Sequence, residues 1–413
     1  LVDGASGVDI RRVSFDRPAE ELMALQEDLA TETSRLLREW LGDEVRVRQA
    51  RASTASAPAW VLVLRAERER KTAEEHGAEG EFETAFDAFA RSDSLLSQAA
   101  RLDTMWVEPH VRLARNDYRR SRMALARQDL HATTSWAERA LVDLRSALRL
   151  DPNDPRALEI RGTIHYWTWL LNLTPDQEER QRLYDLAKAD LERAVEIDPT
   201  LASAHATLGH LYSQENLASS ILAARRAYEE DAYLDNADVV LWRLYTNSAD
   251  LEQFTQARRW CEEGARRFPE DWRFTICRLD LMTMPAGEPA IDGAWALLAR
   301  LDSLDAPPFQ RVYGEIVVGG VIGLAGQPDS ANRVLLDARS RGDPELDPTQ
   351  ELLSYEAAMR SLMGDEDTAI ELQLRYIAAN PGHAFRPDEP IGWWWRPLRD
   401  HPRFHELVAV PDH

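Results

Sequence analysis

Small and apolar residues recur along this chain at helical spacing, and each run ends at a strong helix stop. The run at 187–197 places Ala, Leu, Ala and Ile three or four positions apart and is followed by Asp198-Pro199. The run at 140–150 has the same pattern before Asp151-Pro152. Residues three and four apart share one face of a helix, while proline cannot continue a helix and holds the preceding residue extended. The pattern therefore predicts amphipathic helices with firm ends.

A second pattern follows these stops and indicates how the helices pair. Leu208, Gly209 and Tyr212 form one set, and Leu158 with Gly162 forms another. A small residue lets two antiparallel helices approach closely, and an aromatic residue one turn later fills the adjacent gap. In the last third of the chain the same spacing predicts paired helices at 309–324 with 329–339 and at 350–363 with 366–379.

These residues resemble tetratricopeptide repeats, whose units are helix–turn–helix pairs of about 34 residues. The resemblance is most specific at 155–270. It implies a mainly α fold, a helix-pair solenoid coiled as a right-handed superhelix, with about nine antiparallel pairs over residues 51–382. The stretches 107–152 and 155–199 are each about a dozen residues too long for one repeat, so longer helices are expected there. Thr174 is expected to cap one of them, with Pro175 at its first position.

Both ends of the chain depart from the repeat. Residues 1–50 predict two strands and a helix, and Leu1-Val2-Asp3 with Phe15-Asp16-Arg17-Pro18 resembles the end of a TolB-like domain. We interpret this segment as the remnant of a small α/β domain. The resemblance implies a bacterial protein in which such a domain precedes the repeats, often behind a transmembrane segment and a serine/threonine kinase, adenylate cyclase or regulator domain. Residues 383–413 are predicted to form a cap, in which Trp393-Trp394-Trp395 would cover the apolar end of the solenoid.

The net charge limits the classes of partner that the chain is expected to bind. Of 413 residues, 71 are acidic and 49 basic, which gives a formal net charge of -22. Such a field repels a nucleic-acid backbone and an anionic membrane surface, and no apolar run approaches the roughly 20 residues that span a bilayer. A protein or peptide partner is expected, with no nucleic acid and no membrane span in this chain.

The sequence carries no catalytic signature. It has no glycine-rich nucleotide loop, no His-Glu-x-x-His, no nucleophile elbow and no kinase motif. We therefore expect no enzyme, with no catalytic, cofactor-binding or metal-binding residues, and any kinase or cyclase activity would belong upstream. Cys261 and Cys277 lack the Cys-x-x-Cys spacing and fall on consecutive predicted helices. A disulfide between them is one interpretation, and the favoured interpretation is two buried free thiols.

Binding residues can be placed from the repeat register. The first helix of each pair lines the concave side of a solenoid, and one stripe per first helix would face inward. The alternative for each residue is plain solvated surface. The candidate groove consists of Glu108, Arg115, Tyr118, Arg156, Glu159, Tyr166, His210, Gln214, Arg243 and Thr246.

The pattern as a whole favours a non-catalytic scaffold or sensor that binds a peptide or protein segment in this groove. The alternative is a structural subunit that assembles head to tail into a fibre or homo-oligomer. Molecular mass measured by size exclusion at several concentrations separates the two, since only an open assembly keeps growing. An extracytoplasmic location is favoured over a cytoplasmic one. Asn172-Leu173-Thr174 has the Asn-x-Thr pattern of a glycosylation acceptor.

Overall fold

Most of the described chain is α-helical, as the sequence predicted. The computed structural model describes residues 54–174, 176–232, 234, 236–285, 287–386 and 391–408. The predicted strands and domain remnant at 1–50, and Pro175, lie outside the described residues. The described helices α2 to α17 form eight consecutive pairs, one fewer than the nine or so that the sequence predicted. The chain divides after Thr200 into two compact units, a division that the sequence pattern did not predict.

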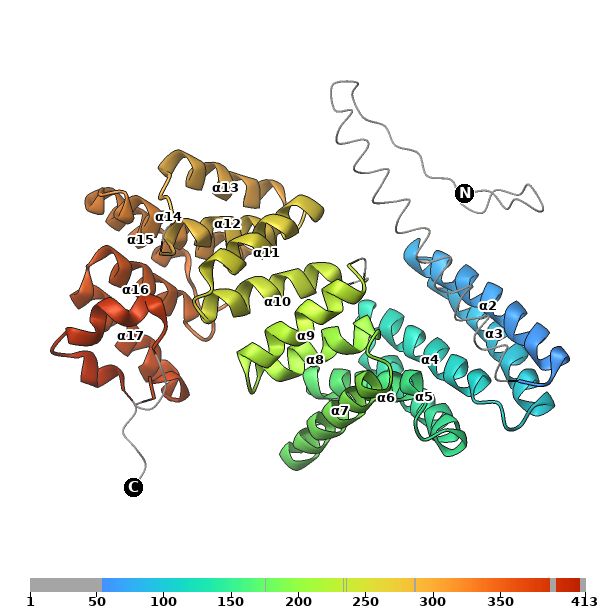
Figure 1. Ribbon diagram of the computed structural model, residues 1–413. Coiled ribbons are helices and arrows are strands. Elements are labelled where there is room, and N and C mark those ends of the chain that lie inside the picture. The colour runs from blue at the N-terminus through green and yellow to red at the C-terminus, as the bar shows by residue number, and fades with distance from the viewer. Residues whose placement is uncertain are drawn as a thin grey trace, which may run out of the picture. The chain divides into compact units, whose positions relative to one another are not determined.

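The first unit contains three long helix pairs, drawn in blue to green in Figure 1. They are α2 (Ala57–Ala78) with α3 (Phe82–Leu102), α4 (Glu108–Ala126) with α5 (Leu130–Leu150), and α6 (Pro155–Leu170) with α7 (Gln177–Ile197).

The second unit contains five pairs and three short 3-10 helices. The pairs are α8 (Ala202–Ser213) with α9 (Leu217–Glu230), α10 (Ala237–Asp250) with α11 (Phe254–Arg267), α12 (Trp272–Thr283) with α13 (Ile291–Ser303), α14 (Pro308–Leu324) with α15 (Pro328–Arg341), and α16 (Glu351–Met363) with α17 (Glu366–Ala379). The 3-10 helices are η2 (Pro381–His383), η3 (Trp393–Asp400) and η4 (Phe404–Leu407). None of the helices in the described ranges is long and apolar enough to cross a membrane.

The helix ends follow the predicted stops, with one correction. Helices α5 and α7 end directly before Asp151 and Asp198, and both aspartates are extended. Helices α5 and α7 have 21 residues each, against 14 in α9, so the long repeats do contain long helices. The cap of α7 is Asp176, however, and not Thr174. The Asp176 carboxylate accepts hydrogen bonds from the backbone N–H groups of two residues in the first turn, which places the helix start two positions later than expected.

Small residues set the distance between paired helices. A Cβ atom added to Gly209 of α8 would lie 3.3–3.5 Å from the backbone and Cβ of Ala224 in α9. The Ser220 hydroxyl of α9 donates a hydrogen bond to the Gly209 carbonyl. Ser220 and Ala224 both face α8 and are fully buried. The small residue predicted to permit close approach therefore lies at the contact between α8 and α9.

In helix α14, glycines permit close approach of neighbouring helices on two sides. An added Cβ at Gly319 would meet the Leu335 side chain of α15 at 2.7 Å, and one at Gly320 would meet Met359 of α16 at 2.4 Å. Helix α14 is therefore packed tightly on both of these sides.

Successive first helices contact one another. In the first unit α4 contacts α2 and α6, and in the second unit α12 contacts α10 and α14, while α14 also contacts α16. Second helices contact mainly the first helix of their own pair and of the next pair. The first helices therefore form the inner layer of each unit, as in a tetratricopeptide-type solenoid.

The tryptophan-rich segment contacts two parts of the second unit. Trp395 and Leu398 are buried in the apolar cluster of α14, α16 and α17. Trp393 instead packs edge-to-face on Phe254 of α11, with 5.6 Å between ring centroids. Arg396 forms an ion pair with Glu252 in the turn between α10 and α11. Helix η3 thus contacts both the pair of α16 and α17 and the pair of α10 and α11.

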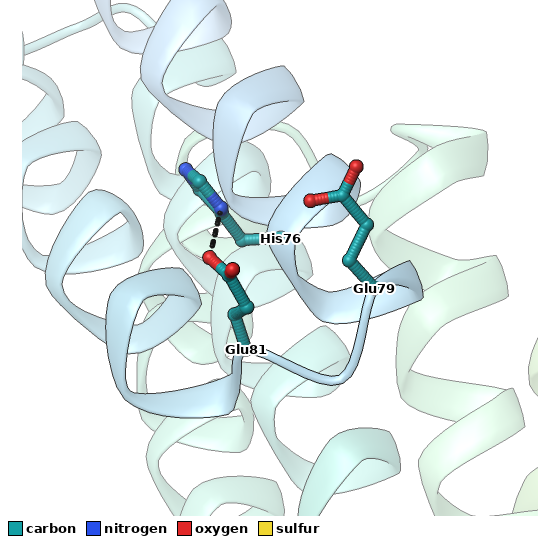
Figure 2. Close-up of side chains that lie close together, drawn as sticks. All are labelled: His76, Glu79 and Glu81. Carbon is teal, nitrogen blue, oxygen red and sulfur yellow. Dashed lines mark hydrogen bonds and ion pairs between the residues drawn. The ribbon is translucent and has the colours of Figure 1, made fainter.

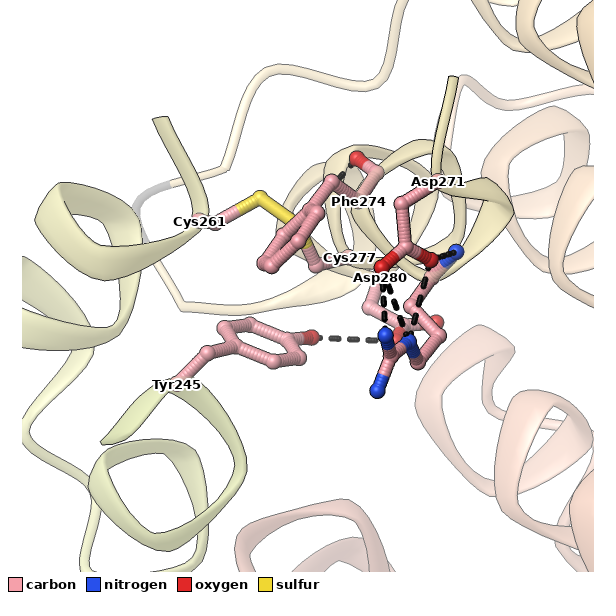
Figure 3. Close-up of a disulfide and its surroundings, with 7 residues drawn as sticks. Tyr245, Cys261, Asp271, Phe274, Cys277 and Asp280 are labelled. Atoms are coloured by element: carbon pink, nitrogen blue, oxygen red, sulfur yellow. Dashed lines mark hydrogen bonds and ion pairs between the residues drawn. A yellow bond between two sulfur atoms is a disulfide. The ribbon is translucent and has the colours of Figure 1, made fainter. Parts of the chain in front are cut away.

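A disulfide joins Cys261 of α11 to Cys277 of α12 (Figure 3). The favoured prediction of two free thiols was therefore wrong. That prediction rested on how often cysteines are buried unpaired, and it did not use distance. The short turn at 268–271 brings α12 back against α11, so the two Cα atoms lie 5.9 Å apart, within the range that a disulfide spans.

The close contact between α8 and α9 gives a stability prediction. Gly209→Leu places a bulky side chain against the Ala224 backbone, and we expect it to destabilise the protein by about 1–3 kcal/mol through overpacking, even though leucine favours helix more than glycine does. Thermal melting followed by circular dichroism measures the change. The matched control is Gly382→Leu, because an added Cβ at Gly382 meets nothing within 4 Å. Equal melting temperatures for the two variants would show that the α8–α9 contact is misplaced.

Candidate functional site

The ten predicted groove residues differ widely in exposure. Glu108, Glu159 and Tyr166 are buried, and Gln214 is exposed just beyond the end of α8. The other six are half-buried: Arg115, Tyr118, Arg156, His210, Arg243 and Thr246. They fall in both units, six in the first and four in the second. Their role in binding stays a prediction, and Asn172, which is exposed in the turn after α6, likewise stays a predicted glycosylation acceptor.

Two of these residues belong to an ion-pair ladder across the inner helices of the first unit. Arg112 of α4 forms ion pairs with Glu67 of α2 and, at 2.6 Å, with Glu108 of α4. Glu108, which is only 2% exposed, also contacts Arg156 of α6 at 2.6 Å. The ladder therefore connects α2, α4 and α6 by side chains that already neutralise one another.

The ladder lowers the pKa values of its carboxyl groups, and this shift stabilises the fold. Burial alone would raise the pKa of Glu67, but hydrogen bonding and charge from Arg70, with Arg112, lower it to about 2. Burial likewise opposes the lowering of the Glu108 pKa, and Arg112 and Arg156 overcome it. A carboxyl whose folded pKa lies below its unfolded pKa stabilises the fold above the unfolded value and loses that contribution as pH falls through the folded pKa. The ladder therefore stabilises the fold at neutral pH.

The other predicted residues make local contacts. Burial raises the pKa of Tyr118, whose hydroxyl is hydrogen-bonded to Trp167 of α6. In the second unit Arg243 donates a hydrogen bond to the Ala206 carbonyl of α8 at 3.3 Å. Burial, and then the Arg243 charge, lowers the pKa of His210 to about 4. His210 is therefore a neutral side chain at physiological pH.

One group of side chains has the residue types of a metal site. His76, Glu79 and Glu81 lie at the turn between α2 and α3, with ligand atoms within 4.8 Å of one another (Figure 2). His76 Nδ1 is 2.8 Å from a Glu81 carboxylate oxygen. Both glutamates are exposed, and Gly80 between them has a φ of +81° that reverses the chain. The turn itself brings these side chains together, so we assign no ion to them.

A different group lies on the inner helices of the second unit, and we call it the Asp280 cluster: Tyr245, Asp280, Tyr313 and Tyr355. The Tyr245 hydroxyl of α10 donates to Asp280 of α12 at 2.9 Å (Figure 3). The Tyr313 hydroxyl of α14 donates to the other carboxylate oxygen at 2.8 Å. The Tyr355 ring of α16 stands edge-to-face on Tyr313, with centroids 4.7 Å apart. The cluster thus crosses the first helices of four successive pairs.

Local structure fixes Asp280 in place. Helix α12 begins at the Asp271 cap, whose carboxylate accepts from the Arg273 backbone N–H at 3.0 Å. One turn before Asp280, the disulfide at Cys277 joins α12 to α11 (Figure 3). Apolar Ile276 and Leu279 are buried toward α13 and α14. Asp280 follows Ile276 and Cys277 by four and three positions and so lies on the same side of α12, where its carboxylate reaches α10 and α14.

In a protein with many arginines, the charge environment of Asp280 is unusual. Burial raises the pKa of the Asp280 carboxyl to about 6, although both tyrosine hydroxyls act in the opposite direction. Burial also raises the pKa values of Tyr245 and Tyr313 well above the ordinary value for tyrosine, and that of Tyr355 to about 12. These hydroxyls stay protonated. Within the described ranges, no arginine, lysine or histidine forms an ion pair with Asp280.

The sequence interpretation included none of the four residues of the Asp280 cluster among the binding residues, although a signal was present. The two hydrogen bonds of Asp280 join residues 35 and 33 positions apart in the chain, close to the repeat length of about 34. Extending the register from Tyr245 by one and two repeats would have reached both partners. The predicted groove stopped at Thr246 because the repeat motifs weaken beyond that point.

Comparisons with known proteins give distant similarities to solved structures. No family model matches the chain, and no curated protein matches it. Among solved structures, PilF of Pseudomonas aeruginosa is 16% identical over 59% of this chain and 96% of its own, with a TM-score of 0.40. A tetratricopeptide repeat protein from Parabacteroides merdae is 15% identical over 71% of this chain and 99% of its own, with a TM-score of 0.37. Yeast Tom70 is 14% identical over 91% of this chain and 72% of its own, with a TM-score of 0.35. Since these scores lie below 0.5, the fold assignment rests on the helix pairing described above.

The ion-pair ladder gives a second prediction. Glu108→Gln leaves the Arg112 and Arg156 guanidinium groups without their shared carboxylate, and breaking a buried ion pair in this way costs about 3 kcal/mol. We expect thermal melting to shift accordingly. The matched control is Glu196→Gln, which breaks an exposed ion pair with Arg193 and should cost less than about 1 kcal/mol. Equal effects of the two substitutions would mean that the ladder does not stabilise the contacts between α2, α4 and α6.

Proposed function

We propose that this chain is a non-catalytic scaffold whose second unit binds a protein segment along the inner helices α10, α12, α14 and α16, with Asp280 accepting a cationic side chain. The observation that carries the proposal is the Asp280 carboxylate itself. It is held by two hydroxyl donors from neighbouring repeats and has no cationic partner in the described part of the chain. An arginine or lysine of a bound segment would supply the missing countercharge.

The tyrosines around Asp280 suit the same ligand. Tyrosine faces attract guanidinium and ammonium groups within about 6 Å. Tyr355 is 38% exposed, so part of the cluster is accessible to a partner. The hydroxyls of Tyr245 and Tyr313 hold the carboxylate in position before a ligand arrives, which lowers the entropy cost of binding.

The overall charge supports a basic partner. A formal net charge of -22 attracts cationic segments and speeds their association at low salt. The predicted groove residues Arg243 and Thr246 lie on α10 close to Tyr245 in sequence, and we include them in the proposed surface. The first-unit candidates Glu108 and Arg156 neutralise each other, and we assign them to stability in preference to binding.

We further propose an extracytoplasmic location, because the Cys261–Cys277 disulfide is typical of oxidising compartments. Both cysteines are fully buried. Alkylation of protein taken from its native cells, followed by mass spectrometry of the peptides that carry these residues, tests this directly. We expect a disulfide-linked peptide pair, and two alkylated thiols in protein denatured without reductant would contradict the proposal.

Binding can be tested with matched peptides. The probe is Ac-Gly-Ala-Arg-Ala-Gly-NH2, and its control replaces arginine with citrulline, which has the same shape and no charge. A charge-assisted hydrogen bond contributes about 1.5–3 kcal/mol, so we expect NMR titration to give at least about tenfold tighter binding for the arginine peptide. Asp280→Asn should remove that preference, whereas Asp302→Asn, an equal charge change on the outer helix α13, should leave it intact.

The pH dependence has a defined sign. A proton and the arginine side chain compete for the same carboxylate, so affinity should be full above about pH 6 and fall as pH drops through the Asp280 pKa of about 6. Asp280→Asn should bind weakly at every pH. Equal affinity of the arginine and citrulline peptides for the wild type at pH 8 would refute cation recognition at Asp280. If Asp280→Asn does not fold, Tyr355→Ala serves as the second variant and should weaken binding of the arginine peptide alone.

A further inference from the structure

The outer helices of the second unit contain a depression that lies apart from the Asp280 cluster. It is formed between α9 and α11, which are second helices of their pairs, and has a volume of about 300 Å³. Six residues line it: Arg225, Tyr228, Glu229, Gln256, Arg259 and Trp260.

The aromatic part of the depression is firmly held. The rings of Tyr228 and Trp260 stand edge-to-face, with centroids 5.9 Å apart and an interplanar angle of 75°. The Tyr228 hydroxyl donates to Glu263 at 2.6 Å and accepts from Arg267 at 3.1 Å. Trp260 is only 3% exposed and belongs to the apolar core of α8 to α12. The depression therefore has fixed walls.

Its polar groups are incompletely satisfied. In the described part of the chain, Arg225 Nε, Gln256 Oε1 and Trp260 Nε1 are buried and lack a hydrogen-bond partner. Buried polar groups in folded proteins are almost always hydrogen-bonded. All three atoms belong to residues that line one depression, which favours a ligand that completes them.

The residue types identify the chemistry of that ligand. Arg225 and Trp260 offer N–H donors, and the Arg259 guanidinium lies over the Trp260 ring at 4.8 Å. The Gln256 amide presents either its oxygen or its NH2 group, because the two orientations are interchangeable. The lining contains two arginines and one carboxylate, Glu229, so the depression is locally cationic in an acidic chain. An acceptor with two oxygens and a negative charge suits this donor set.

We propose that this depression binds a carboxylate group of a protein partner, either an aspartate or glutamate side chain or a chain terminus. Arg225 and the Trp260 indole N–H hold its oxygens, Arg259 supplies charge from the rim, and Tyr228 provides the apolar wall. The site does not depend on the function proposed for the inner helices, because it shares none of the residues of the Asp280 cluster.

The test uses the indole N–H signal of Trp260 in protein labelled with 15N-tryptophan, assigned by Trp260→Phe. Sodium acetate is titrated at constant ionic strength against acetamide, its neutral counterpart. We expect acetate to shift the Trp260 signal to saturation and to bind at least tenfold more tightly than acetamide. Arg225→Gln should weaken acetate binding at least fivefold. The control is Arg226→Gln, the adjacent α9 position, where an exposed arginine pairs with Glu230, and it should leave binding unchanged.

Two peptides distinguish the source of the carboxylate. Ac-Ala-Glu-Ala-NH2 carries it on a side chain and Ac-Ala-Ala-Ala-OH carries it at the chain end, and tighter binding of either one supports the site and names its ligand. Equal effects of acetate and acetamide, an unchanged Trp260 signal, or equal losses from Arg225→Gln and Arg226→Gln would overturn the proposal. Because acetate and acetamide are compared on the folded wild type, a misfolded variant cannot produce the first two of these results.

Discussion

The close approach of helices at alanine and glycine is the constraint on which the rest of this structure depends. Fully buried alanines recur along the second helices, as at Ala147, Ala194 and Ala227, and Gly209 of α8 lies opposite the buried Ala224 of α9. An added Cβ at Gly162 of α6 would meet Leu191 of α7 at 2.8 Å. Close pairs stack at a regular interval, so side chains one repeat apart come within hydrogen-bonding distance. The bonds from Tyr245 and Tyr313 to Asp280 follow from that regularity.

The two units use this regularity differently. In the first unit, Glu67, Arg112, Glu108 and Arg156 alternate in sign across successive inner helices, and each charge has a partner. In the second unit, the equivalent layer places two hydroxyls beside the Asp280 carboxylate, and no cation of the described residues pairs with it. Balanced charges stabilise a stack, whereas an unbalanced, half-buried carboxylate is a candidate for recognition. We therefore propose that binding occurs in the second unit and that the ladder of the first unit stabilises the fold.

Much of the fold could be predicted from the sequence, because helix periodicity and proline stops are local signals. The predicted helices at 309–324 and 366–379 match α14 and α17 closely. The cap of α7 was misplaced because threonine and aspartate two residues apart both suit that role. The disulfide was missed because pairing depends on the distance between α11 and α12, which residue types do not give. The Asp280 cluster was missed for a related reason: its members lie in three-dimensional register, and Asp280 and Tyr313 follow no local motif.

The most direct measurement of the central claim is the titration of the Asp280 carboxyl carbon by NMR in protein labelled with 13C-aspartate. We expect a midpoint near 6 in the free protein, set by burial without a cationic partner, and a clearly lower midpoint when an arginine peptide is bound, because a bound cation favours the charged carboxylate. A midpoint near the ordinary aspartate value in the free protein, unchanged by the peptide, would contradict it.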